Sequence, residues 1–233
     1  MFTFKVYTRS PQGTRSKRHT DYIKWYNGAM CGRYQIDAQN PKKIQSRFHL
    51  KKEPTFISNW NVAPSQQMPI IKADNEMEIV KWGLKPFFMD KDLINIRAES
   101  LEKSWTHKYF QHQRCLIPAS GFYEWKKSKE GKVPYYIHLK DEPLFAFAGV
   151  YSESSGYSII TTTPNDVMSD IHNRMPVILE KKEEQEWLNP DMVEIDEIQT
   201  YLKPYPAQHM EAYPVSSRVN SPAFNDNSLI KAT

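Results

Sequence analysis

The sequence contains little cysteine, little glycine and no long apolar run. Its 233 residues include two cysteines, Cys31 and Cys115, and eight glycines against sixteen prolines. Two cysteines exclude a disulfide framework or a cysteine-rich zinc site, and they favour a reducing compartment. The histidines are scattered without metal-ligand spacing, so we expect no metal and no organic cofactor. Without an apolar run of about 18 residues, no transmembrane helix is expected either.

Positive charge is concentrated at the start of the chain. Residues 1–29 hold six basic side chains and one acidic side chain, which gives +5, whereas the whole chain carries +4. The body that follows is therefore nearly neutral, at −1. Any nucleic-acid binding by this body must come from a local arrangement of arginines, because its overall charge is too small.

The composition changes at Met30, from a polar basic segment to a sequence that alternates like strands. Asn40 followed by Pro41 predicts the start of a short helix, with Ile44 and Phe48 on one face. Two more helices are predicted over Lys181–Leu188 and Val193–Leu202 from their spacing of charged and apolar residues.

Short apolar runs rich in β-branched or aromatic residues predict the strands. These runs are Met68–Ile71, Met77–Trp82, Cys115–Pro118, Phe122–Trp125, Tyr135–Leu139, Leu144–Tyr151, Tyr157–Thr162 and Met175–Leu179. Strands therefore outnumber helices, which indicates one α+β domain over residues 30–225, with a tail at 226–233.

Five polar clusters interrupt the apolar surroundings. They lie at 30–33 (MCGR), 95–99 (NIRAE), 121–125 (GFYEW), 161–165 (TTTPN) and 171–176 (IHNRMP). Taken singly, each has a structural interpretation, since a lone glutamate between aromatic residues usually faces water at a strand edge. A lone histidine before a strand is more often structural than catalytic. Cys115, within an apolar stretch, is expected to fill the core.

Together these motifs resemble a known family. With Asn61-Val62-Ala63-Pro64 and Trp82-Gly83-Leu84, they occur in the order seen in the SOS response-associated peptidase (SRAP) family, whose members crosslink to abasic DNA. The resemblance implies a strand-rich α+β fold of curved mixed and antiparallel sheets in a barrel-like arrangement with a few short helices. It also implies single-stranded DNA containing abasic sites as the partner, a monomer, and a cytoplasmic or nucleoid-associated role in the DNA damage (SOS) response.

The resemblance further implies that Cys31 is the first residue of the mature protein. An N-terminal cysteine carries an amine and a thiol two carbons apart. The amine condenses with the aldehyde of an opened abasic sugar, and the thiol then closes a thiazolidine ring. The reference pKa of an α-amine is about 7.7–8.0, so part of it is a neutral nucleophile at physiological pH. The nitrogen of an internal cysteine is an amide and cannot react in this way.

Three further catalytic residues follow from the resemblance. Glu124 is expected to take a proton from the attacking amine and to help the carbinolamine lose water. Its aromatic neighbours Tyr123 and Trp125 would raise its pKa if they pack against it. His172 is expected to protonate the sugar oxygen during ring opening. Asn95 is expected to hold the amine or the sugar hydroxyl by neutral hydrogen bonds.

Five residues are predicted to bind DNA. Arg33, Arg97 and Arg174 lie beside the reactive residues and suit backbone phosphates. Trp82 and Pro64 are expected to support or wedge a base stack. The alternative for two of the arginines is a surface salt bridge, Arg97 with Glu99 and Arg174 with Asp170.

The twenty-nine residues before Met30 depart from the family pattern, because Cys31 has no free amine while they remain. We expect them to be disordered, and three explanations are open. Translation begins at Met30 and the methionine is removed, or the segment is a propeptide cut before Cys31, or it is retained and the covalent activity is absent.

Two other functions compete with crosslinking. A cysteine peptidase would use Cys31, Glu124 and His172 on peptide bonds, and would turn over peptides and process its own chain. A non-covalent module for single-stranded or modified DNA would bind in a salt-sensitive manner that does not depend on Cys31.

Overall fold

The computed structural model describes residues 31–233, so the predictions for residues 1–29 and Met30 lie outside the described residues. The strands are β1 Arg33–Ile36, β2 Asn59–Val62, β3 Gln67–Ile71, β4 Met77–Lys81, β5 Asn95–Arg97, β6 Arg114–Ala119, β7 Gly121–Ser128, β8 Gly131–Leu139, β9 Phe145–Ser152, β10 Gly156–Thr162, β11 Met175–Pro176 and β12 Met210–Pro214. The α-helices are α2 Pro41–Arg47, α3 Ser104–His112, α4 Asp166–Ser169, α5 Glu184–Leu188 and α6 Ile195–Gln199. Short 3-10 turns are η1 Ala73–Asn75, η2 Ala98–Glu102, η3 Ala207–His209, η4 Ser217–Asn220 and η5 Asn227–Ile230.

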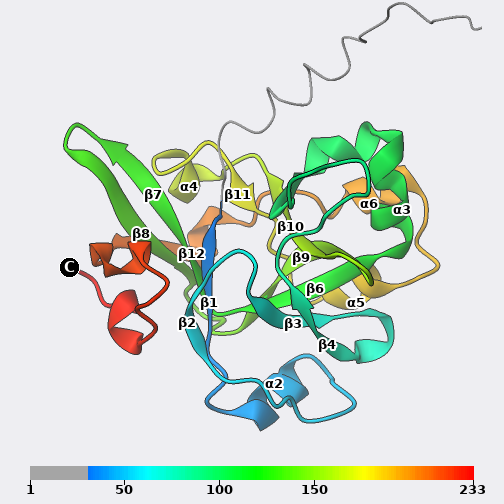
Figure 1. Ribbon diagram of the computed structural model, residues 1–233, viewed down its shortest axis with the longest axis horizontal. Coiled ribbons are helices and arrows are strands. Elements are labelled where there is room, and N and C mark those ends of the chain that lie inside the picture. The colour runs from blue at the N-terminus through cyan, green and yellow to red at the C-terminus, as the bar shows by residue number, and fades with distance from the viewer. Residues whose placement is uncertain (1–30) are drawn as a thin grey trace, which may run out of the picture.

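The strands form two sheets (Figure 1). The smaller sheet has the order β12-β8-β7-β1-β2, and every pair in it is antiparallel. The larger sheet has the order β11-β10-β9-β6-β3-β4, and β5 adds to β10 in parallel. A parallel bridge from Trp82 to Tyr157 brings the end of β4 back to β10, so the larger sheet curls towards itself. The prediction of a strand-rich α+β fold with mixed and antiparallel sheets is confirmed.

The main core lies where the two sheets face each other. Tyr34 of β1 packs edge-on against Trp82 and Phe147, and Phe122 of β7 also packs against Phe147. Tyr123, the next residue of β7, points to the opposite face, as alternation along a strand requires. There it joins a second cluster whose other buried members are Tyr136, Val215, Val219 and Leu229. The smaller sheet is therefore covered on both faces, by the larger sheet and by the C-terminal segment.

Helix α2 begins as the sequence predicts. The side chain of Asn40 accepts a hydrogen bond from the backbone of Lys43 at 3.1 Å, with Pro41 in the first turn. Ile44 and Phe48 are both buried. The two later helices form but are shorter than predicted, at Glu184–Leu188 and Ile195–Gln199.

Every predicted apolar run contains a strand, although β11 keeps only Met175 and Pro176 of its run. The sequence did not predict helices α3 and α4 or strands β2, β5 and β12. Within the described part of the chain, no helix has the length and apolar character needed to cross a membrane.

Candidate active site at the start of β1

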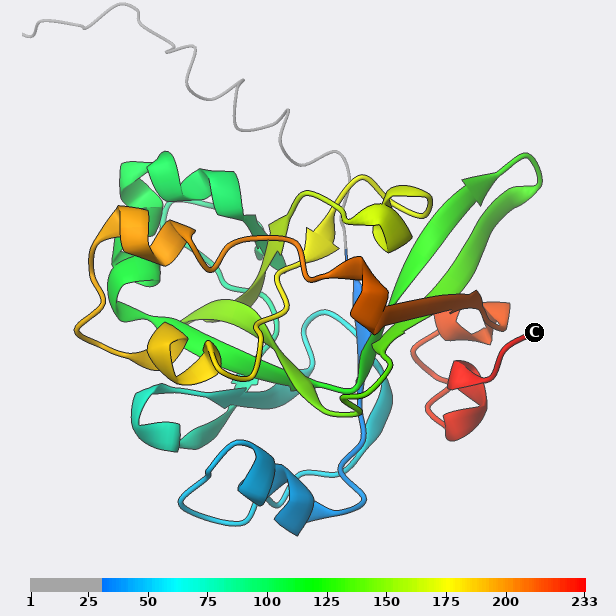
Figure 2. The same ribbon diagram turned by 180° about the vertical axis from the view of Figure 1, so that it is seen from behind.

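Cys31 lies two residues before the start of β1 and is fully buried. Its backbone nitrogen donates a hydrogen bond to Oε1 of Glu124 at 2.6 Å. The register explains this contact, because β1 pairs with β7 so that Arg33 lies opposite Tyr123. In both views the start of β1 lies close to β7 and to the segment of α4 and β11 (Figures 1 and 2). The fold thus brings together two predicted residues that are 93 positions apart.

The backbone of Cys31 is strained. Its φ angle is +46°, in the left-handed region that a residue with a side chain adopts at a cost of about 1–2 kcal/mol. The angle exists only because residue 30 is attached, since φ is defined by the preceding carbonyl carbon. A Cys31 that is the first residue would have no such strain.

Glu124 is a buried carboxylate with a shifted pKa. Its exposed fraction is 3%, and its Oε2 accepts a hydrogen bond from the backbone of Trp125 at 3.0 Å. Burial raises the pKa of Glu124 to about 6, against the lowering effect of the hydrogen bonds from Cys31 and Trp125 and of the charge on Lys132. The direction of this shift agrees with the expectation from the sequence, and its cause is burial. A carboxyl group with this pKa both accepts and donates protons near neutrality.

The thiol of Cys31 is held in its protonated form. Burial raises the pKa of this thiol, and the negative charge of Glu124 raises it further. The thiol is electrostatically coupled to Tyr34 and Tyr157, whose hydroxyls lie 2.8 Å apart. Tyr157 belongs to β10, so Cys31 lies close to both sheets.

His172 lies in the turn after α4, where its backbone nitrogen donates to the carbonyl of Met168 at 2.8 Å. Its Nδ1 is buried and has no hydrogen-bond partner within residues 31–233. Burial lowers the pKa of His172, and the charges of Lys127, Lys132 and Arg174 lower it further. Lys132 therefore acts on both His172 and Glu124, which places the two groups in one electrostatic environment.

Asn95 and Arg97 stand on β5, which pairs with β10 so that Arg97 lies opposite Thr161. Arg174 reaches the same point, because its Nη2 donates to the carbonyl of Thr161 at 2.6 Å. The guanidinium of Arg174 also forms a two-pronged ion pair with Glu99, with Nη2 2.8 Å from Oε2. The alternative of a salt bridge for Arg174 is therefore realised, with Glu99 as its partner and not Asp170.

Arg33 is engaged within the protein. Its Nη1 donates to Oδ1 of Asn61 at 2.8 Å and to the carbonyl of Val219 at 3.1 Å, and its Nη2 donates to the carbonyl of Asn220 at 3.2 Å. Asn61, the first residue of the Asn-x-Ala-Pro motif, is buried and donates to further carbonyls of the C-terminal segment. Both side chains therefore hold this segment against the smaller sheet.

The prediction that Trp82 contacts a base stack is wrong. Trp82 is fully buried, its ring stacks on Tyr157 at 6.4 Å, and its Nε1 donates to the carbonyl of Ile94 at 2.9 Å. A side chain without exposed surface cannot stack on a base. Pro64, by contrast, is exposed, and its role stays a prediction.

Two exposed aromatic residues were not predicted from the sequence as site residues. Phe87 and Phe88 follow β4 in the connection to β5, and their exposed fractions are 93% and 45%. Their rings meet edge to face at 5.2 Å, and Phe88 also packs on Trp105. The signal in the sequence was a pair of aromatic residues after Pro86 in an otherwise polar segment, which is an unusual place for buried side chains.

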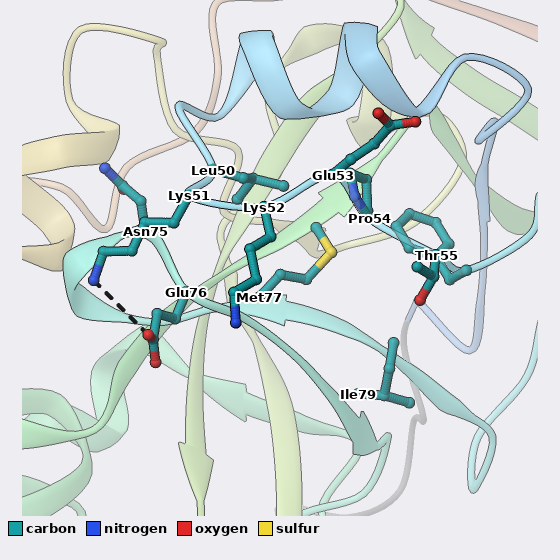
Figure 3. Close-up of a pocket in the computed structure, with 11 residues that line it drawn as sticks. Leu50, Lys51, Lys52, Glu53, Pro54, Thr55, Asn75, Glu76, Met77 and Ile79 are labelled. Carbon is teal, nitrogen blue, oxygen red and sulfur yellow. Dashed lines mark ion pairs between the residues drawn. The ribbon is translucent and has the colours of Figure 1, made fainter.

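A separate groove lies between the segment that follows α2 and the β3–β4 hairpin (Figure 3). Its wall includes Leu50, Met77 and Ile79, and an ion pair between Lys51 and Glu76 spans 3.8 Å. None of the predicted site residues lines this groove. It is therefore distinct from the cluster around Cys31.

This chain is similar to known proteins over most of its length. The family model described as SOS response associated peptidase (SRAP) matches residues 30–222. The abasic site processing protein YoqW of Bacillus subtilis (strain 168) is 42% identical over 224 residues, covering 87% of this chain and 100% of YoqW. The abasic site processing protein HMCES of Gallus gallus is 26% identical over 219 residues, covering 73% of this chain and 65% of HMCES.

The fold also matches a solved structure. The crystal structure of a protein from Bacteroides thetaiotaomicron superposes with a TM-score of 0.76 and 29% sequence identity. The match covers 87% of this chain and 100% of that protein. The two-sheet arrangement is therefore shared over nearly the whole described body.

Proposed function

The chain belongs to the SOS response-associated peptidase (SRAP) family, and from this we propose that it processes abasic sites in single-stranded DNA by trapping them covalently. The reactive residue is Cys31, with its backbone nitrogen free as an amine. The observation that carries the proposal is the 2.6 Å contact between this nitrogen and the carboxylate of Glu124. The names of the relatives, which are abasic site processing proteins, support the choice of substrate.

The reaction joins the protein to the opened abasic sugar with loss of one water. The amine nitrogen forms a bond to the aldehyde carbon, and its proton passes to the oxygen to give a carbinolamine. The hydroxyl then leaves as water, which gives an imine. The sulfur adds to the imine carbon, the thiol proton moves to the nitrogen, and the five-membered thiazolidine is complete.

Glu124 serves the proton transfers at the nitrogen. As a carboxylate it takes the proton from the attacking amine, and as a carboxylic acid it returns that proton to the departing hydroxyl. A pKa of about 6 suits both steps near neutral pH. The raised pKa of the Cys31 thiol keeps the sulfur protonated, so the amine attacks first and the sulfur closes the ring afterwards.

His172 and Asn95 act on the sugar. Ring opening moves the proton of the sugar hydroxyl to the ring oxygen. Because the pKa of His172 is lowered, its neutral ring first accepts the hydroxyl proton and then protonates the ring oxygen. Asn95, at the start of β5, holds the sugar hydroxyl or the amine by neutral hydrogen bonds.

The amine becomes available when the bond between Met30 and Cys31 is absent. The left-handed φ of Cys31 supports this step, since loss of residue 30 releases the strain at that position. Translation from Met30 followed by removal of the methionine, or cleavage of a propeptide, would both give the reactive form.

The DNA strand is proposed to pass over exposed side chains of the body. Phe87 and Phe88 take the stacking role that Trp82 cannot fill, because stacking requires an exposed aromatic face. Pro64 is a further exposed contact. Arg97 is proposed to bind phosphate. Arg33 and Arg174 form internal hydrogen bonds, which they must exchange for a phosphate contact.

A cysteine peptidase is a weaker candidate. The nucleophile of such an enzyme is a thiolate, and its pKa is lowered by its surroundings. Burial and Glu124 instead raise the pKa of the Cys31 thiol. A non-covalent DNA-binding module would not explain the contact between Cys31 and Glu124.

The test compares the full chain with a form that begins at Cys31, both verified by intact mass. Each is incubated with a single-stranded oligonucleotide that contains one abasic site. The form that begins at Cys31 is expected to give an adduct whose mass equals protein plus DNA minus one water. The proposal fails if this form gives no adduct, or if a full chain with residue 30 still attached gives the same adduct.

A further inference from the structure

The hairpin of β7 and β8 carries a dense positive charge. It projects from the body on the side of α4, and the view from behind shows the same projection (Figures 1 and 2). Four lysines lie within seven residues, at Lys126, Lys127, Lys129 and Lys132, against the single acid Glu130. The lysine ion pairs formed within residues 31–233 use other lysines, those at 51, 72, 81, 182 and 203.

Two of these lysines oppose each other. In the β7–β8 register, Lys127 lies directly opposite Lys132. Side chains of directly paired residues stand on the same face of a hairpin, and like charges in that position destabilise it. Both lysines are exposed, so neither is needed for the core. An arrangement that costs stability without contributing to packing points to an anion that binds between the two ammonium groups.

The pair is close enough to act on the reactive cluster. Lys127 and Lys132 both lower the pKa of His172, and Lys132 also lowers the pKa of Glu124. Along β7, Lys127 is three residues beyond Glu124, which is about 10 Å of extended strand, and alternation places its side chain on the face opposite to that of Glu124, so the DNA strand would pass around the hairpin. This distance corresponds to roughly three nucleotides of a stacked DNA strand at about 3.4 Å each.

We propose that Lys127 and Lys132 together bind the phosphodiester backbone of the DNA strand that carries the abasic site, within a few nucleotides of the lesion. This inference rests on the proposed function, because it takes DNA as the polyanion. The overall charge of the body is nearly neutral. The two hairpin lysines would therefore supply local positive charge for a phosphate contact.

The test measures non-covalent binding of the full chain to an intact single-stranded oligonucleotide without an abasic site, by fluorescence anisotropy at several salt concentrations. Loss of two phosphate contacts in K127Q/K132Q is expected to reduce the slope of log K against log salt by about 1.4, since each contact contributes about 0.7. Affinity at low salt is expected to fall on the order of tenfold. The variant K127R/K132R should keep the slope, because arginine retains the charge.

The matched control is K42Q/K43Q on α2, which removes the same charge from exposed lysines at the opposite end of the molecule (Figure 1). Its slope should match that of the unchanged chain. The inference is overturned if K127Q/K132Q behaves like this control, or if K127R/K132R loses the slope as well. Failure of the proposed function gives a different result. Abasic DNA then forms no adduct, while the slopes of K127Q/K132Q and of the control still differ.

Discussion

Cys31 and Cys115 are both fully buried, and burial raises the pKa of both thiols, yet the regions around them are built differently. Around Cys115 the polar groups are satisfied. The indole of Trp187 donates to the carbonyl of Cys115 at 3.0 Å. The guanidinium of Arg114 donates to four carbonyls at the ends of α3 and α5, those of residues 110, 111, 187 and 189.

Around Cys31 several features are unfavourable for stability. The cysteine has a left-handed φ, the carboxylate of Glu124 is buried, and Nδ1 of His172 lacks a partner among the described residues. Lys127 and Lys132 oppose each other nearby. Unfavourable features that gather in one place indicate a functional site, because selection for stability alone would remove them. The sulfur atoms are alike, so the backbone nitrogen beside Glu124 distinguishes the two cysteines.

The largest expected contrast comes from alanine at each cysteine, in the form that begins at Cys31. Cys31→Ala should abolish the stable adduct with abasic DNA, since the ring cannot close without the sulfur. Cys115→Ala should keep the adduct and lower the free energy of unfolding by about 1–2 kcal/mol, as expected for a small buried side chain. Intact mass and chemical denaturation measure the two effects. A folded Cys115→Ala protein without adduct would break the comparison.

Glu124→Gln is expected to slow adduct formation by about 100-fold or more, because an amide cannot move protons as a carboxyl group does. The rate is followed by gel under single-turnover conditions, again with Cys31 as the first residue. Glu53→Gln, at an exposed glutamate in the separate groove, serves as the matched control and should leave the rate unchanged. Equal rates in the two variants would remove Glu124 from the reaction.

Most of the longer strands and the helix start at Asn40 were predictable because they depend on local patterns. A short apolar run indicates a buried strand. The side chain of Asn40 accepts a hydrogen bond from the first turn of α2, and the ring of Pro41 suits the first helical position. Helix α3 was missed because its residues, SWTHKYFQH, mix polar and aromatic side chains without an apolar stripe. Strands β2 and β5 are too short to show a period.

The contacts of the site depended on residues far apart in the sequence. Trp82 was assigned to DNA from its motif, but its bridge to Tyr157 buries it in the core. Glu99 pairs with Arg174, which is 75 residues away in the sequence. The family motifs predicted Cys31 and Glu124 as reactive residues, and the β1–β7 register explains how their atoms meet.

Glu124 should also make the stability of the full chain depend on pH. Its pKa is raised in the folded protein from 4.5 to about 6, so the folded state binds the proton more tightly than the unfolded state. Stability from this group is therefore complete below about pH 4.5 and is lost as the pH rises through about 6. The loss amounts to about 2 kcal/mol.

Denaturation of the full chain between pH 4 and pH 7 measures this loss against Glu124→Gln, in which it should disappear. Glu53→Gln should retain the pH dependence of the unchanged chain. Identical pH dependence in all three proteins would show that the carboxylate of Glu124 is not destabilised by burial, and the contrast with the region of Cys115 would weaken.

The smallest expected effect lies on the projecting hairpin. Lys127→Thr removes one of two opposed positive charges and places a β-branched residue on a strand, so the free energy of unfolding should rise by about 0.5 kcal/mol. The same substitution at Lys42 on α2 relieves no opposed pair and should not stabilise the protein, because threonine is a poorer helix former than lysine. Thermal denaturation compares the two variants with the unchanged chain. If Lys127→Thr gains stability and binds DNA more weakly, the hairpin keeps a charge that lowers stability because that charge serves DNA binding. If the variant loses stability, Lys127 supports the fold as Arg114 does.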